Sequence, residues 1–189
     1  MKIINENYDF KNGLENRTKT DKIVIHHRAG DGDVQSIHAQ HKNQGFSGIG
    51  YHFYVRKSGQ VYKGRPIASV GAHAIGANYD SIGVCFEGNF DVEDTMPPQQ
   101  LKAGKELVSY LKTLYPRAEI ISHRDVQSTA CPGRYFPFEN IREGVKELTV
   151  EEAIEIVQAK AGLEDETIDF LLFYKYGEEL SVKIAEAMI

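Results

Sequence analysis

Short apolar segments alternate with amphipathic helical segments along most of this chain, and few folds accommodate that alternation. Segments rich in β-branched and aromatic residues predict strands at residues 22–26, 51–55, 60–62, 81–87 and 119–122. Helical periodicity predicts helices at residues 33–44, 97–114 and 138–148. Lys57-Ser-Gly59 is a hairpin signal between two of the strands, so the sheet is not purely parallel. We therefore expect an α/β domain with a mixed central β-sheet flanked by helices.

The last part of the chain predicts a small helical C-terminal subdomain. Thr149-Val-Glu-Glu152 is a capping box, in which the Thr and Glu side chains satisfy each other's backbone donors. Glycines mark the following helix ends, which predicts helices at about 149–162, 165–176 and from 178 onward. We therefore divide the chain into a main domain at 1–148, with its core at 22–148, and a subdomain at 149–189.

So short a subdomain is not expected to bury much core on its own. We therefore expect its apolar side chains to pack against another surface, either on the main domain or on a partner. These residues are Ile154, Val157, Ile168, Leu171, Leu172 and Ile184. At the other end of the chain, residues 1–20 are polar and predict an irregular arm on the main domain.

The charge distribution argues against nucleic-acid partners. The 189 residues carry a formal net charge of −5. Residues 149–189 contain three Lys and ten Asp or Glu, a balance of −7, which leaves +2 on the rest. A nucleic-acid binder is expected to show a clustered basic face instead. No segment approaches the roughly 18 apolar residues of a membrane span. Because the start of the chain also lacks the apolar core of a signal peptide, we expect synthesis in the cytoplasm.

Three residues could form a zinc site. His26 ends the first strand, His123 follows the last strand, and Cys131 lies in the loop after it. Two imidazoles and one thiolate leave one coordination position open, as in catalytic rather than structural zinc sites. Alternation along a strand sends neighbours to opposite faces, so the pattern alone does not choose between His26 and His27. Since a disulfide would destroy this site, we expect both Cys85 and Cys131 to be reduced.

Two other histidines offer a competing metal site. His38 and His41 share one face of the predicted helix at 33–44. No acidic or thiol third ligand lies near them in the sequence, so we expect a solvated helix face instead. In the strand at 51–55, His52 is expected to point into the core, away from the face that carries Tyr51.

Six motifs along the chain resemble one known family. They are Val24-Ile-His26, Gly50-Tyr-His-Phe53, Val70-Gly-Ala-His-Ala74, Asn78-Tyr-Asp-Ser-Ile-Gly-Val84, Ser122-His123 and Ala130-Cys-Pro132. Their order and spacing resemble the zinc N-acetylmuramoyl-L-alanine amidases, which include phage lysozyme-type amidases and animal peptidoglycan recognition proteins. The resemblance covers about residues 22–148.

The resemblance implies a peptidoglycan hydrolase that cleaves the amide between N-acetylmuramic acid and L-alanine. It implies one Zn²⁺ per chain held by His26, His123 and Cys131, which resolves the choice between His26 and His27. It implies Tyr51 as the catalytic tyrosine. The expected partner is cell-wall peptidoglycan, reached after release from the cytoplasm by a phage endolysin or a bacterial autolysin.

Five further residues follow from the same resemblance. Thr129 stands where many phage members carry a Lys that stabilises the oxyanion, and its hydroxyl could donate a hydrogen bond there. Cys85 stands where other branches carry a Glu base, and Glu87 on the same face is either a substitute or structural. His73 and Asn78 are candidates for substrate binding.

The sequence leaves two alternative functions open. The first is a non-catalytic peptidoglycan-binding module, although receptor members of the family typically lack the metal-binding Cys that is present here as Cys131. The second is an intracellular amidase that recycles soluble muropeptides. The C-terminal helices favour the endolysin, because they predict wall attachment or self-association, and a recycling enzyme needs no attachment to the wall.

Overall fold

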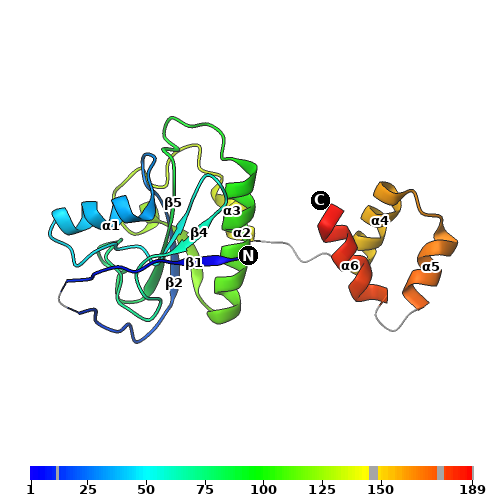
Figure 1. The fold of residues 1–189 in the computed structure, drawn as a ribbon, viewed down its shortest axis with the longest axis horizontal. Coiled ribbons are helices and arrows are strands. Elements are labelled where there is room, and N and C mark those ends of the chain that lie inside the picture. Colours follow the sequence, from blue (N-terminus) through cyan, green and yellow to red (C-terminus); the bar gives the residue numbers. More distant parts are fainter. Residues whose placement is uncertain (12, 145–148, 174–176, 189) are drawn as a thin grey trace. The chain divides into compact units, whose positions relative to one another are not determined.

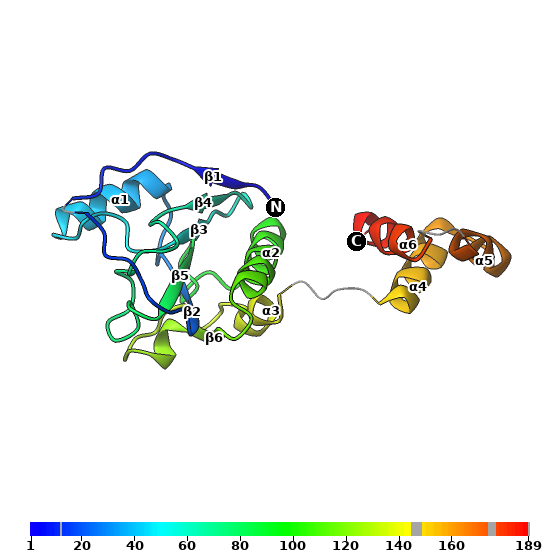
Figure 2. The same cartoon turned by 90° about the horizontal axis from the view of Figure 1, so that it is seen from below.

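The computed structural model describes residues 1–11, 13–144, 149–173 and 177–188, without the side chains of residues 170, 171, 186 and 187 (Figures 1 and 2). The chain forms two compact units, Met1–Val145 and Lys146–Ile189. The domain boundary predicted at Leu148 falls outside the described residues. Within the described residues, no helix combines the length and apolar character needed to cross a bilayer.

The first unit is built on one six-stranded sheet. Its strands lie in the order β1 (Ile3–Asn5), β4 (Val61–Lys63), β3 (Phe53–Val55), β5 (Ser81–Phe86), β2 (Lys22–His27) and β6 (Glu119–Ser122). All neighbours are parallel except β3 and β4, which form the antiparallel hairpin around Lys57-Ser-Gly59. The predicted mixed sheet is therefore confirmed.

The two central strands are buried on both faces of the sheet. Every residue of β5 is buried, as are all residues of β2 after Lys22. Strands covered on both faces appear in a sequence as continuous apolar runs rather than alternating ones. The register pairs His26 with Cys85 and Ile25 with Ser122. The carboxyl ends of β2 and β6 therefore lie side by side, which brings the residues that follow them together.

Helices cover the two faces of this sheet (Figure 2). On one face, α2 (Pro98–Leu114) and α3 (Phe138–Glu143) pack on a large apolar cluster that includes Ile23, Ile25, Val84, Phe86, Leu107 and Leu111. On the other face, Val34 and Ile37 of α1 (Val34–Asn43) pack on Tyr54 and Cys85. Because side chains alternate along a strand, His26 lies on the α1 face of the sheet.

Three local predictions differ from the structure. Residues 1–20 are not wholly irregular, because Ile3–Asn5 pair with β4 as a parallel edge strand and Ile3 packs against the main core. The strand predicted from residue 51 begins only at Phe53. The helix predicted at 138–148 ends at Glu143, where Gly144 adopts a positive φ of 69°, and residues 145–148 lie outside the described residues.

In its described residues, 149–173 and 177–188, the second unit has three helices with a core of their own. They are α4 (Val150–Ala161), α5 (Asp165–Phe173) and α6 (Gly177–Met188), and the predicted capping box of Thr149 and Glu152 opens the first. Ala153, Val157, Ile168 and Ala185 are buried between them.

The prediction that this unit cannot bury its apolar positions is therefore wrong for two of them. Val157 is 1% exposed and Ile168 is 4% exposed. Small alanines let the helices approach closely, so three short amphipathic faces enclose a core. Ile154, Leu172 and Ile184 are partly buried against it, and the side chain of Leu171 lies outside the described residues.

Candidate active site

Three side chains with metal-ligating atoms meet at the carboxyl ends of β2 and β6. His26 is the penultimate residue of β2, His123 begins the short 3₁₀ helix η1 (His123–Asp125), and Cys131 lies in the loop that follows. Their ligand atoms all lie within 4.8 Å of one another, with Cys131 Sγ 3.9 Å from His26 Nδ1. The rings of His26 and His123 have centroids 4.4 Å apart. The structure thus brings together all three residues that were predicted as ligands.

His27 does not take part in this cluster. It lies on the opposite face of β2, where its Nδ1 accepts the Phe90 N–H at 3.1 Å. Its ring stacks on Phe90, and its Nε2 lies 3.9 Å from Asp91.

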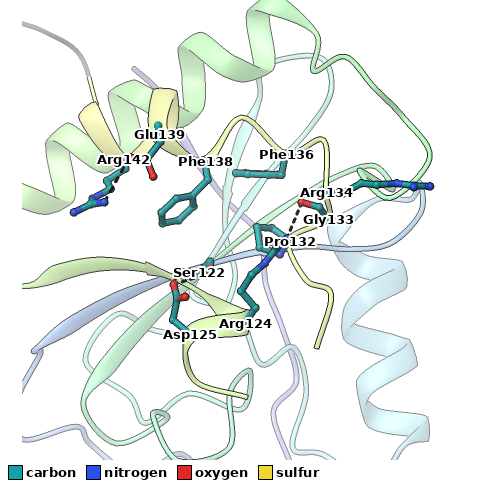
Figure 3. A pocket seen from close by; sticks show the side chains of 10 residues that line it. All are labelled: Ser122, Arg124, Asp125, Pro132, Gly133, Arg134, Phe136, Phe138, Glu139 and Arg142. Atoms are coloured by element: carbon teal, nitrogen blue, oxygen red, sulfur yellow. Dashed lines mark hydrogen bonds and ion pairs between the residues drawn. The ribbon is translucent and has the colours of Figure 1, made fainter. Parts of the chain in front are cut away.

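The loop that carries His123 and Cys131 is held in shape by its own hydrogen bonds. The Asp125 carboxylate accepts both the backbone N–H and the hydroxyl of Ser122. The Arg124 N–H donates to the Cys131 carbonyl at 3.1 Å. The Arg124 guanidinium donates to the carbonyl oxygen of Ala130 at 2.8 Å. It also donates to the carbonyl oxygen of Gly133 at 2.8 Å (Figure 3). These contacts close the loop, so that its two ends approach the same point.

The pocket drawn in Figure 3 borders this loop but is not the ligand cluster. It has a volume of about 350 Å³, and Arg124, Pro132, Phe136 and Arg142 are among its lining residues. None of the three candidate metal ligands lines it. Its three arginines also have partners already. Arg142 lies 3.5 Å from Glu139, Arg124 donates to carbonyl groups, and Arg134 donates to the Asp91 carbonyl at 2.9 Å.

Burial shifts the pKa of two of the candidate ligands, His26 and Cys131. It lowers the pKa of His26 well below its usual value, and the nearby His123 adds to this effect. The neutral imidazole is the form that binds a metal. Burial raises the pKa of Cys131 to about 11, so the thiol stays protonated at neutral pH until a cation is present. A coordinating thiol is deprotonated by its metal, which fits a site that loses a proton on loading.

Tyr51 lies beside this cluster, two residues before the start of β3. Its ring centroid is 5.2 Å from that of His26. Burial, together with Cys85 and Cys131, raises the pKa of the Tyr51 phenol well above its usual value. The phenol therefore remains a hydrogen-bond donor throughout the neutral range.

The histidines of α1 support the segment that leads to Tyr51. His38 Nδ1 accepts the Ile49 N–H at 3.2 Å, and His41 Nδ1 accepts the Gly50 N–H at 3.0 Å. The prediction of a solvated helix face is wrong here, because His38 is only 4% exposed. The structure does not support a competing metal site at His38 and His41, because a ring nitrogen of each already accepts a hydrogen bond from a backbone N–H group.

The two candidates for substrate binding, His73 and Asn78, make hydrogen bonds within the protein. His73 is 9% exposed, and its Nδ1 lies 3.0 Å from His26 Nε2. The Asn78 side-chain oxygen accepts the N–H groups of His73 and Ala74 at 2.8 and 3.0 Å. Both side chains are thus occupied within the protein. Sequence reasoning missed Gln127, whose Oε1 lies 2.9 Å from His123 Nε2; no motif marks it.

The remaining candidates are placed as follows. The hydroxyl of Thr129 accepts the Cys131 N–H at 3.2 Å, so this residue shapes the turn before the ligand.

The Glu87 carboxylate accepts two hydrogen bonds from the Arg56 guanidinium, each 3.0 Å long, and is also bound by the N–H groups of Gly32 and Lys57. This arrangement favours the structural interpretation of Glu87. Cys85 and Cys131 are both free, as expected.

The chain is similar to proteins of one family. Residues 16–134 match the family described as N-acetylmuramoyl-L-alanine amidase. The endolysin of Enterobacteria phage K11 is 38% identical over 124 residues, which cover 61% of this chain and 82% of the endolysin. Peptidoglycan-recognition protein SC2 of Drosophila melanogaster is 38% identical over 126 residues, covering 58% of this chain and 66% of that protein.

A solved structure extends the similarity beyond this region. N-acetylmuramoyl-L-alanine amidase LysC from Clostridium intestinale URNW superposes with a TM-score of 0.72 at 38% identity. The match covers 87% of this chain and 99% of that one. The matched part of the chain is longer than the first unit, Met1–Val145. The similarity therefore includes part of the helical unit.

Proposed function

As a member of the N-acetylmuramoyl-L-alanine amidase family, the chain is a peptidoglycan hydrolase of the endolysin type, and we propose that it cleaves the amide between N-acetylmuramic acid and L-alanine with one Zn²⁺ held by His26, His123 and Cys131. The observation that supports this most strongly is the convergence of three ligand atoms within 4.8 Å, from residues far apart in the sequence. All three residues lie inside the region that matches the family.

The donor set fits zinc. Two imidazole nitrogens and one thiolate are ligands that Zn²⁺ commonly takes in tetrahedral sites. No fourth His, Cys, Asp or Glu joins the cluster within the described part of the chain. Three protein ligands leave one position for water or substrate, which is the arrangement of catalytic rather than structural zinc.

Zinc, when bound, supplies a Lewis acid that polarises the substrate carbonyl and activates water for attack. The protein residues supply the rest of the chemistry. The protonated phenol of Tyr51 donates a hydrogen bond to the oxyanion that develops as the carbonyl carbon becomes tetrahedral. Thr129 is exposed and its hydroxyl already accepts the Cys131 N–H, so its hydroxyl proton is available as a second donor. His26 is buried and Tyr51 is partly buried, and electrostatic contacts are stronger where water is excluded.

Cys131 argues against the receptor alternative. Receptors in this family typically lack the metal-binding Cys, whereas Cys131 here lies next to both histidines, with its Sγ 3.9 Å from His26 Nδ1. A chain that only bound peptidoglycan would have no need for this cluster.

We further propose that the second unit attaches the enzyme to the wall, and that the enzyme reaches the wall after release from the cell that makes it. Two observations support this function. The unit has its own buried core, and its charge balance of −7 differs from that of the rest of the chain. Self-association through these helices is the competing outcome, which sedimentation of the full chain would detect.

Digestion of purified peptidoglycan tests the proposed function. Each cleavage should release one new N-terminal L-alanine and leave an intact lactyl carboxylate on the glycan, both of which mass spectrometry identifies. Cleavage should stop on zinc removal and return when zinc is added back. New reducing sugar ends in place of new alanine termini would contradict the proposal, as would full activity after complete zinc removal.

A further inference from the structure

Each histidine of the metal cluster has its second ring nitrogen engaged by a neighbouring group. His26 Nε2 lies 3.0 Å from His73 Nδ1, and His123 Nε2 lies 2.9 Å from Gln127 Oε1. The direction of both hydrogen bonds can be worked out from their partners. That direction decides which nitrogen of each ligand faces the metal.

On the His26 side, a chain of hydrogen bonds has one consistent direction. The Ser81 hydroxyl donates to the Ala77 carbonyl oxygen, which can only accept. Ser81 Oγ is therefore available as an acceptor for His73 Nε2, 3.4 Å away. With its proton on Nε2, neutral His73 accepts at Nδ1, so His26 Nε2 carries the proton. The lone pair of His26 is then on Nδ1, the nitrogen nearest Cys131 Sγ.

On the His123 side, a backbone group fixes the direction. The Ile75 N–H donates to Gln127 Oε1 at 2.9 Å. A backbone N–H can only donate, so the Gln127 atom at this point must be the oxygen. His123 Nε2 must then donate to the same oxygen, which leaves the lone pair of His123 on Nδ1.

Both contacts depend on the same loop, between β4 and β5. His73 and Ile75 belong to it, and Asn78 closes it by accepting the His73 and Ala74 N–H groups. Ala74 and Ala77 anchor it in a buried cluster with Val24 of β2.

The His73 ring has no room to turn in this loop. A Cβ at Gly83 would lie 2.5 Å from His73 Cγ and Cδ2, and one at Gly71 would lie 2.5 Å from His73 Cδ2. The ring is thus enclosed between two glycine positions, where only hydrogen atoms fit.

We propose that the loop at residues 73–78, acting through His73 and Gln127, is a positioning device that holds both histidine ligands in the Nε2–H form with Nδ1 toward the metal. His73 is then a positioning residue rather than a contact of the substrate, and Gln127 is its counterpart for His123. This inference rests on the proposed metal site. Partners of this kind fix the orientation of metal-binding histidines, and their loss typically lowers metal affinity or activity about 10–100-fold.

The test is the Zn²⁺ dissociation constant of the full chain, measured by competition with a chromophoric chelator. His73→Phe and Gln127→Leu remove the acceptors, and each should weaken zinc binding about 10–100-fold. His73→Asn places an oxygen near the former Nδ1 position, and Gln127→Glu keeps an acceptor for both donors. These two variants should bind zinc more tightly than their apolar counterparts. Gln35→Leu, on the exposed side of α1, is the matched control and should bind like wild type.

A second readout separates positioning from general stability. The Co²⁺-substituted protein should show altered visible absorption in His73→Phe and Gln127→Leu, with recovery in His73→Asn and Gln127→Glu. A merely structural role would lower the thermal midpoint of the metal-free protein and leave the dissociation constant and the Co²⁺ spectrum unchanged. That result would overturn the inference. Failure of the wild-type chain to bind zinc would instead overturn the proposed function. Gln127 is partly exposed, so its variants test the inference even if His73→Phe does not fold.

Discussion

At the scale of single residues, Tyr51 is the proposed hydrogen-bond donor beside the candidate metal ligands. Its phenol is protonated and lies beside His26, and its backbone position is set by the bonds of His38 and His41 to the residues before it. Tyr51→Phe should lower kcat by a factor of roughly 10²–10³, the usual cost of losing one oxyanion donor. Zinc content and thermal midpoint should stay close to wild type. An unchanged kcat, measured on a soluble muramyl peptide, would remove Tyr51 from the mechanism.

Glu87 is the residue where a catalytic and a structural role can be separated. Both carboxylate oxygens are bound by Arg56 and by backbone N–H groups. Glu87→Gln should lower the free energy of unfolding by about 1–3 kcal/mol, since a buried charge-assisted network is weakened. Hydrolysis by the folded variant should be nearly normal.

Urea unfolding and single-turnover hydrolysis, measured side by side, check this prediction for Glu87. A stable variant with greatly reduced hydrolysis would make Glu87 a general base after all.

At the scale of elements, the segment Tyr51–His52 before β3 links the site to the core through His52. The His52 ring accepts the Gly83 N–H and bonds to the Ser69 carbonyl, and burial lowers its pKa from 6.5 to about 3. Below about pH 6.5 the unfolded chain therefore binds a proton that the folded chain does not. Stability contributed by neutral His52 is present above that pH and is lost as the pH falls toward 3.

The metal-free protein should accordingly lose stability between pH 6.5 and 4.5, by up to about 1.4 kcal/mol per pH unit for each such histidine. Urea unfolding at a series of pH values measures the slope. His52→Asn keeps an acceptor for the Gly83 N–H but does not titrate. The slope of its free energy of unfolding against pH should therefore correspond to the uptake of about one proton fewer on unfolding. Equal slopes for the two proteins would contradict the assignment.

The elements that the sequence predicted well are those with strong local patterns. The buried strands β2 and β5 are continuous apolar runs, and α2 opens at Pro98 as expected. The edge strand Ile3–Asn5 carries no such pattern, because its formation depends on pairing with β4, nearly sixty residues away.

The same contrast holds within the site. His26, His123 and Cys131 could be predicted because ligand chemistry restricts residue type and because the family resemblance chose His26 over His27. The role proposed for His73 could not be predicted, since it depends on which nitrogen of a neighbouring ring faces it in the fold. Gln127 gave no signal at all, because a glutamine in a loop has many equally common uses.

At the scale of the whole molecule, the two units should have separable functions. The second unit has its own core and lies outside residues 16–134, the region that matches the family. A chain ended after Leu148 should therefore cleave a soluble muramyl peptide at a rate close to wild type. It should bind and lyse intact sacculi poorly, because the proposed attachment unit is missing.

Co-sedimentation with sacculi and turnover of the soluble peptide measure these two properties independently. A truncated chain that unfolds, or that loses activity on the soluble peptide, would show that the helices belong to the catalytic fold. Full lysis of sacculi by the truncated chain would contradict a role in attachment.

The zinc content of purified wild-type, His123→Ala and Cys131→Ser proteins tests the central proposal most directly. The convergence of the three ligands predicts one zinc per wild-type chain and largely lost zinc in both variants. Folding should persist in both, since these ligands lie outside the apolar clusters of the sheet. Full zinc occupancy in both folded variants would contradict the ligand assignment.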